Sequence, residues 1–214
     1  DKMQTVVVDG ASFTVNPGEV LCIVGESGCG KSVTALSLLG LLNPNARILK
    51  GRALFEGRDL LKMPEKELDR IRGNEITMIF QDVANSLNPV FTVGNQLTET
   101  VRIHMGYDGK KAKEYAKEML EKVGLPDAGA VMKKYPHMLS GGMQQRVMIA
   151  MALACKPRLI IADEPTTALD VTIQLQIMKL LADLQKEFQM SMILITHDIG
   201  LVAELADRVI IMYA

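Results

Sequence analysis

The fold of this chain of 214 residues is decided by one stretch, Gly25-Glu26-Ser27-Gly28-Cys29-Gly30-Lys31-Ser32. The stretch fits the pattern G-x-x-x-x-G-K-S, which forms a phosphate-binding loop when a strand precedes it and a helix follows it. The apolar residues 20–24 before it predict a buried strand, and residues 33–42 after it predict a helix. Glycines let the backbone wrap closely around a polyphosphate, with its N–H groups and the positive end of the helix dipole facing the ligand. We therefore expect the loop to bind a nucleoside triphosphate.

Individual residues of this loop have separate expected roles. Lys31 would reach the β- and γ-phosphates, and the Ser32 hydroxyl would bind Mg²⁺. The predicted nucleotide-binding residues are Gly25, Glu26, Ser27, Gly28, Cys29, Gly30, Lys31, Ser32 and Val33. A glycine-rich turn with a chance Lys-Ser pair is the alternative, and the flanking strand and helix argue against it.

Composition limits the classes of protein to consider. A hydrophobic content of 48% predicts a sizeable core, and a net charge of −1 without a basic tract argues against nucleic acid as the main partner. The three cysteines lack metal-ligand spacing and fit a reducing compartment. No apolar run reaches the roughly 20 residues that cross a bilayer, so we do not expect the chain alone to be a channel or permease. Because residue 1 is not Met and the chain stops inside an apolar run, we expect a fragment of a longer protein.

Strands and helices are predicted to alternate on both sides of a helix-rich middle. Apolar runs predict strands at residues 51–57, 76–80, 159–162, 191–196 and 208–212. Residues 82–155 instead carry amphipathic helix patterns, at 94–104, 110–123 and 143–154. The alternation predicts a mostly parallel sheet. We therefore expect an α/β core formed by residues 1–81 and 156–214, with a helical subdomain inserted at 82–155.

Two predicted strands end in polar residues that can act on a phosphate. The strand at 159–162 is followed by Asp163 and Glu164, and we expect it to lie beside the phosphate-loop strand. Asp163 would then lie near Mg²⁺, and Glu164 could deprotonate a water that attacks the γ-phosphate. A solvated acidic turn is the alternative. His197 ends another strand and could contact the γ-phosphate or the water, although a lone histidine is more often structural.

Two further sequence features suggest ligand contacts. Gln81 follows a strand, and its amide oxygen can bind Mg²⁺, although a lone glutamine there is usually a polar surface residue. Ser140, Gly141 and Gly142 precede a predicted helix, which favours a second anion site at a helix N-terminus. An N-cap with a flexible entry is the alternative. One nucleotide needs no second anion site, so this one would serve another molecule.

Taken in order, these motifs resemble those of the ATP-binding-cassette (ABC) ATPases over essentially the whole chain. The ATPase subunits of dipeptide and oligopeptide importers are the most similar branch. The supporting stretches are Ile79-Phe80-Gln81-Asp82, Ser86-Leu87-Asn88-Pro89, residues 163–170 (Asp-Glu-Pro-Thr-Thr-Ala-Leu-Asp) and Val171-Thr172-Ile173-Gln174. The resemblance implies an α/β fold: a P-loop NTPase (RecA-like) core with a mostly parallel sheet, an inserted α-helical subdomain and a small antiparallel β portion.

The resemblance also implies a mechanism, in which two chains form a head-to-tail dimer and sandwich two ATP molecules with Mg²⁺. Asp170 would lie at the dimer seam. The implied catalytic residues are Glu164, His197 and Gln81. The implied metal ligands are Ser32, Gln81 and Asp163. The residues implied to contact the ATP of the partner chain are Ser140, Gly141 and Gly142.

Partners and location follow from the same resemblance. The implied partners are a second ATPase subunit (identical or related), two transmembrane permease subunits and, indirectly, an external substrate-binding protein, with no nucleic acid. The implied location is peripheral, on the cytoplasmic face of the cell (inner) membrane. A soluble ABC-type ATPase of DNA repair or translation is an alternative, as is an ATP-binding regulatory module without turnover.

One feature of the family is not found before the phosphate loop. ABC ATPases usually carry an aromatic residue there that stacks on adenine, but no Tyr or Trp precedes the loop and Phe13 lies too close to it. We therefore expect that residue outside this chain. The transported substrate is not predicted from these residues.

Overall fold

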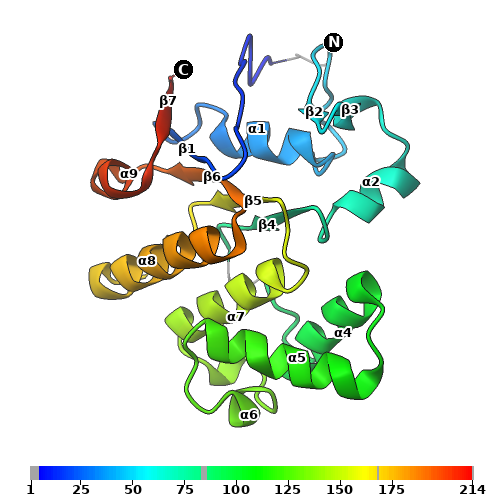
Figure 1. Cartoon of the computed structure of the whole chain (residues 1–214). Coiled ribbons are helices and arrows are strands. Elements are labelled where there is room, and N and C mark those ends of the chain that lie inside the picture. The colour runs from blue at the N-terminus through cyan, green and yellow to red at the C-terminus, as the bar shows by residue number, and fades with distance from the viewer. Residues whose placement is uncertain (1–4, 83–85, 168, 214) are drawn as a thin grey trace.

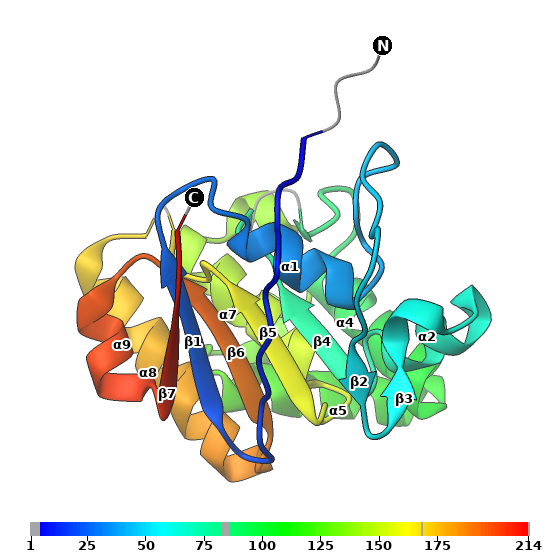
Figure 2. The same ribbon diagram turned by 90° about the horizontal axis from the view of Figure 1, so that it is seen from above.

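A computed structural model gives the structure of this chain and describes residues 5–82, 86–167 and 169–213. Within these ranges the centre is a five-stranded sheet in the order β4-β5-β6-β1-β7, and every neighbouring pair is parallel (Figures 1 and 2). Its strands are β1 (Val20–Gly25), β4 (Ile76–Ile79), β5 (Leu159–Asp163), β6 (Ser191–Thr196) and β7 (Arg208–Met212). The mostly parallel sheet predicted from the alternating elements is confirmed.

Side chains of the inner strands alternate between two buried faces. In β1, Cys22 packs into one core cluster and Ile23 into the other; in β6, Leu194 and Ile195 divide in the same way. A strand buried on both faces needs apolar residues at every position, which explains why these strands read as continuous apolar runs.

Helices cover both faces of the sheet. On one face lie α1 (Lys31–Leu38) and α2 (Glu65–Ile71), and on the other lie α7 (Gly141–Leu153), α8 (Val171–Phe188) and α9 (Ile199–Leu205). Figure 1 shows α1 above the sheet, with α7 and α8 below it. This three-layer arrangement leaves the strand ends as the place for a ligand.

The remaining long helices form a group farther from the sheet, at the bottom of Figure 1. They are α4 (Val93–Met105), α5 (Gly109–Lys122) and the short α6 (Ala128–Val131), and they pack with α7 in the same core cluster. Gly94 permits close packing there, since a Cβ at this position would lie 2.6 Å from the Met132 carbonyl oxygen. The helices predicted at 94–104 and 110–123 are confirmed, while the subdomain bounds 82–155 stay a prediction.

Three local expectations were wrong in detail. The single strand expected at 51–57 is a hairpin of β2 (Leu54–Phe55) and β3 (Arg58–Asp59), because Glu56 and Gly57 both take positive φ (51° and 78°) and reverse the chain. The resulting small sheet is the expected antiparallel β portion. The helix expected at 33–42 ends earlier, since Gly40 is left-handed and Leu41 N–H donates to the Leu36 carbonyl.

The third correction concerns the sheet order. We expected β5, which carries the acidic pair, to lie beside β1, but β6 lies between them. The other described elements are two short 3-10 helices, η1 (Leu60–Lys62) and η2 (Pro136–Met138). No helix within the described ranges has the length and apolarity needed to cross a membrane.

Candidate active site

The phosphate loop lines a cavity of about 510 Å³ at the carboxyl ends of the parallel strands. Side chains that follow three other strands, β4, β5 and β6, reach the same cavity, because carboxyl ends of parallel strands meet at one sheet edge. The lining residues are Val7, Gly25, Glu26, Ser27, Gly28, Gly30, Lys31, Ser32, Val33, Gln81, Glu164 and His197. The structure therefore brings together the loop and three predicted polar residues that are far apart in sequence.

Lys31 is held inside the loop. Its ammonium donates to the carbonyl oxygens of Gly25 (2.8 Å) and Glu26 (2.7 Å), and its side chain is buried. Cys29 is also buried, with its Sγ 3.9 Å from the Lys31 Nζ, and it does not line the cavity. The loop thus encloses the Lys31 ammonium, which places a positive charge inside the loop.

Two loop glycines are required by packing as well as by ligand access. A Cβ at Gly25 would lie 2.1 Å from the Met212 carbonyl oxygen of β7. Gly30 has φ +94°, and a Cβ there would lie 2.7 Å from Val8. Any side chain at either position would displace backbone or a packed neighbour.

Ser32 and Asp163 form a pair of oxygen ligands on one side of the cavity. The Ser32 hydroxyl donates to Asp163 Oδ1 at 2.9 Å, and Asp163 is buried at the end of β5. Burial raises the pKa of Asp163, and the hydrogen bond from Ser32 lowers it in part. Neighbouring hydroxyl and carboxylate oxygens are the donor set that Mg²⁺ accepts, so these residues fit the predicted metal site although β5 is not adjacent to β1.

Replacing Asp163 by asparagine is expected to stabilise the chain against unfolding. Because the pKa of Asp163 is raised on folding, the charged form carries a penalty that grows as pH rises through that pKa. Asparagine carries no charge, and its side-chain oxygen can still accept from Ser32. Calorimetry at pH 7 should show a higher Tm than that of the parent chain, and the gain should shrink toward acidic pH.

Asp183→Asn is the matched control, since Asp183 is an exposed acid on α8. Its Tm should equal that of the parent chain. A lower Tm for Asp163→Asn than for the parent at pH 7 would contradict the burial argument.

Glu164 is the centre of a hydrogen-bonded cluster at the mouth of the cavity. Its Oε2 accepts from Gln81 Nε2 (3.1 Å) and Thr167 Oγ1 (2.9 Å), and His197 Nδ1 lies 3.5 Å away. Its backbone is left-handed (φ 44°), an uncommon state for a residue with a Cβ, and its N–H donates to the Ile195 carbonyl. The strained turn after β5 therefore fixes the carboxylate beside the phosphate loop.

Sequence reasoning missed Thr167 and Val7. The Thr167 hydroxyl donates to Glu164, three residues earlier in the chain. A hydroxyl residue at that spacing from the carboxylate could have indicated this contact. Val7 lines the cavity from the N-terminal segment, which carried no motif. Phe13 packs against the core cluster under α1 and does not line the cavity.

The second predicted anion site lies elsewhere. Ser140 caps α7 by accepting from Met143 N–H (3.4 Å), and neither it nor Gly141 or Gly142 lines the cavity. Gly142 is needed by packing, since a Cβ there would lie 2.9 Å from Ile173 of α8. Ser140 and Gly141 are exposed at the start of α7, and their predicted role as an anion site for another molecule stays a prediction.

Known proteins are similar to this chain in sequence. The sequence profile of the family described as "ABC transporter" matches residues 8–167. The chain is 54% identical over 208 residues to the dipeptide transport ATP-binding protein DppD of Bacillus subtilis, covering 97% of this chain and 62% of that protein. It is 54% identical over 214 residues to the oligopeptide transport ATP-binding protein OppD of Haemophilus influenzae, covering 100% of this chain and 66% of that one. The chain thus spans less than two thirds of these curated relatives.

Solved structures are similar as well. A dimeric ATP-binding cassette bound to ADP and Pi in a post-hydrolysis state superposes with a TM-score of 0.83 at 30% identity, covering 99% of this chain and 90% of that one. The cbiO1 protein of Clostridium perfringens, part of an ABC transporter complex, gives a TM-score of 0.79 at 31% identity, covering 96% and 78%. These likenesses confirm the predicted fold class.

Proposed function

This chain belongs to the ABC transporter family, and from that premise we propose that it is the ATP-hydrolysing subunit of an importer for dipeptides or oligopeptides. The observation that carries the proposal is the cluster of Glu164 with Gln81, Thr167 and His197 at the mouth of the phosphate-loop cavity. A cavity that only held a nucleotide would not need an oriented carboxylate beside the loop. The similarity of the chain to peptide transport ATP-binding proteins supports dipeptides or oligopeptides as the substrate class.

ATP would lie with its phosphates in the loop formed by residues 25–32. Lys31 would exchange its two carbonyl partners for oxygens of the β- and γ-phosphates, and the loop N–H groups would donate to the same charge. Ser32 Oγ and Asp163 would hold Mg²⁺, which when bound neutralises charge on the phosphate oxygens. Gln81 donates to Glu164 through its amide nitrogen, so its amide oxygen is the atom left for the metal.

Glu164 would act as the general base. Donors from Gln81 and Thr167 hold Oε2 in place, so the carboxylate can orient a water and take its proton as the water attacks the γ-phosphate. The His197 side chain is largely exposed, and it would contact the γ-phosphate or the water. Thr167 is a positioning residue in this scheme, since it acts through Glu164.

The ATP site would be completed by a second subunit. Ser140, Gly141 and Gly142 lie outside the cavity of their own chain and would donate to the ATP of the partner. Val171 and Leu175 lie in the first two turns of α8 after Asp170, and Ile199 begins α9 two residues after His197. All three expose apolar side chains, which a closed dimer would cover. ATP would favour the closed dimer, and hydrolysis would reopen it.

Replacing Ser140 by arginine is expected to block ATP-driven dimerisation while leaving ATP binding to the monomer within about twofold. The large side chain would occupy the open start of α7, where the partner's phosphates belong, but Ser140 does not touch the cavity of its own chain. The test uses Glu164→Gln, which prevents hydrolysis from reopening the dimer. Gel filtration with ATP should show a dimer for Glu164→Gln alone and a monomer for Glu164→Gln combined with Ser140→Arg.

Asn95→Arg adds the same charge at an exposed position of α4, and it should dimerise normally. Ser140→Ala removes the hydroxyl without adding bulk, so it should weaken the dimer less than Ser140→Arg does, because the backbone N–H groups of Gly141 and Gly142 would still donate to the partner's ATP. If Ser140→Arg abolishes ATP binding to the monomer, the trans role of this residue is wrong.

The subunit would act on the cytoplasmic face of the inner membrane, bound to two permease subunits and, through them, coupled to an external substrate-binding protein. Phe80, Val90 and Phe91 are exposed apolar residues on either side of residues 83–85, and they would supply a surface for a permease helix. Affinity purification from detergent-solubilised membranes should retain both permease subunits. A protein that stays free of membranes and carries no permease would favour a soluble ABC-type ATPase.

A further inference from the structure

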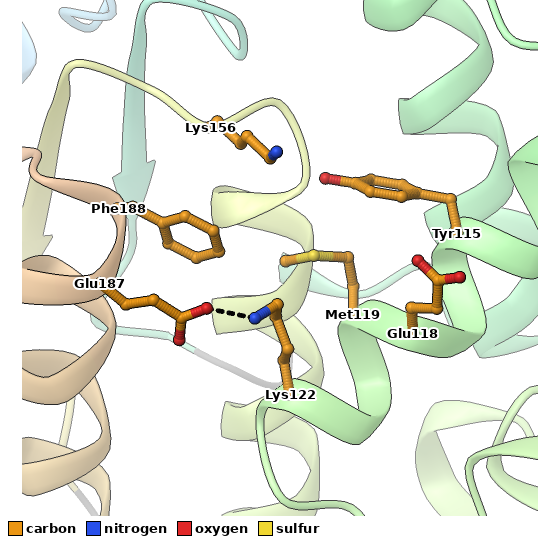
Figure 3. A pocket seen from close by; sticks show the side chains of 7 residues that line it. All are labelled: Tyr115, Glu118, Met119, Lys122, Lys156, Glu187 and Phe188. Atoms are coloured by element: carbon orange, nitrogen blue, oxygen red, sulfur yellow. Dashed lines mark hydrogen bonds and ion pairs between the residues drawn. The ribbon is translucent and has the colours of Figure 1, made fainter.

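A second hollow, of about 350 Å³, lies between the helical group and the sheet-bearing part of the chain (Figure 3). Its walls come from α5, from the loop after α7 and from the C-terminal end of α8. Tyr115, Met119 and Phe188 supply apolar surface. The hollow shares no lining residue with the phosphate-loop cavity, and its volume falls in the range of about 300–1,000 Å³ typical of small-molecule sites.

Four charged side chains surround this apolar surface, and only two of them are paired with each other. Lys122 and Glu187 form an ion pair between α5 and α8, and the Lys122 ammonium lies 5.5 Å from the centre of the Phe188 ring. Within the described part of the chain, the side chains of Lys156 and Glu118 have no ion pair or hydrogen bond. The hollow therefore offers one open cation and one open anion beside an apolar surface.

The wall that carries Lys156 is held in a defined shape. The Tyr115 hydroxyl donates to the Ala154 carbonyl at 2.9 Å, which ties the loop after α7 to α5. The backbone of Lys156 is left-handed (φ 51°), a conformation that glycine usually adopts after a helix. Here the position carries a long cationic side chain instead. Figure 3 shows that side chain reaching over the hollow toward the Tyr115 hydroxyl.

We propose that this hollow binds a small zwitterion, an α-amino acid or a short peptide with an apolar side chain. Lys156 would bind the carboxylate and Glu118 the ammonium group, while the apolar side chain covers Met119 and Phe188. The formal charges of the wall, two lysines against two glutamates, sum to zero, which matches a zwitterion and disfavours a polyphosphate. The proposed peptide import would deliver such ligands to this side of the membrane, but the binding itself does not depend on that function.

Calorimetric titration with leucine and with Leu-Leu tests the site, because both carry the two charges and an apolar side chain. We expect saturable binding of at least one of them. N-acetyl-leucine lacks the ammonium group and leucine amide lacks the carboxylate, so each should bind about tenfold more weakly than leucine. Glu118→Gln should abolish the preference for leucine over N-acetyl-leucine, and Lys156→Gln should abolish the preference over leucine amide.

Lys113→Gln and Glu114→Gln are matched controls, since both residues are exposed on α5 outside the hollow. All affinities of these controls should stay within about twofold of the parent. ATP affinity, measured for every variant, reports that the fold and the phosphate loop are intact. The proposal is overturned if neither leucine nor Leu-Leu binds at millimolar concentration, or if both discriminations survive Glu118→Gln and Lys156→Gln.

Discussion

Replacing Glu164 by glutamine is expected to slow ATP hydrolysis by roughly 10²–10⁴-fold, the usual contribution of a general base, while ATP still binds. Glutamine keeps the size of the side chain, and its oxygen can still accept from Gln81 and Thr167. It cannot accept the proton of the attacking water. Phosphate release under saturating ATP measures the loss, and single-turnover mixing separates it from product release.

The control is Glu204→Gln, the same change at an exposed position of α9. It should hydrolyse ATP at the parental rate. Equal rates for Glu164→Gln and the parent would show that the base is another group. Thr167→Val should lower the rate less than Glu164→Gln does, because it loosens the carboxylate without removing it.

Replacing Lys31 by alanine is expected to weaken Mg²⁺-ATP binding by roughly 10²–10⁴-fold. The ammonium would contact two phosphates, and each hydrogen bond to a charged group contributes about 1.5–3 kcal/mol. The same change leaves the Gly25 and Glu26 carbonyls without their donor, so the loop also loses its internal support. Titration with a fluorescent ATP analogue measures the affinity.

Lys31→Arg is the informative companion variant. It keeps the charge, but a planar guanidinium cannot replace a compact ammonium enclosed by two carbonyls, so binding should remain weak. Lys113→Ala, at an exposed position on α5, should bind ATP as the parent does. Normal ATP affinity in Lys31→Ala would refute the assignment of the phosphate loop.

Much of the local structure could be predicted because its causes are local. The loop Gly25–Ser32 needs glycines at particular places, and the packing of Gly25 and Gly30 confirms why they cannot be replaced. Helix starts at Ser140 and Asp170 are set by side chains that accept from N–H groups three residues further on. The hairpin at Glu56-Gly57 was missed, because β-strands of two residues give no periodic pattern.

The candidate site was predictable residue by residue but not as an assembly. The strand-end positions of Glu164 and His197 could be read from apolar runs that stop at polar residues. The shared hydrogen bonding could not be predicted: Gln81 and Thr167 both donate to one oxygen of Glu164. This contact depends on the left-handed backbone of Glu164 and on the course of the chain after β4.

By itself the sequence determined that a phosphate loop joins a buried strand to a helix, that the sheet is parallel, and that the chain resembles the ABC ATPases. Only the tertiary structure decided that β6 separates β1 from β5, and that α5 and α8 enclose a second hollow. The physical reason is the separation in sequence between the residues that interact. Loop geometry, strand burial and helix capping act between residues close in sequence, whereas strand order and cavities arise from packing between segments that periodicity does not pair.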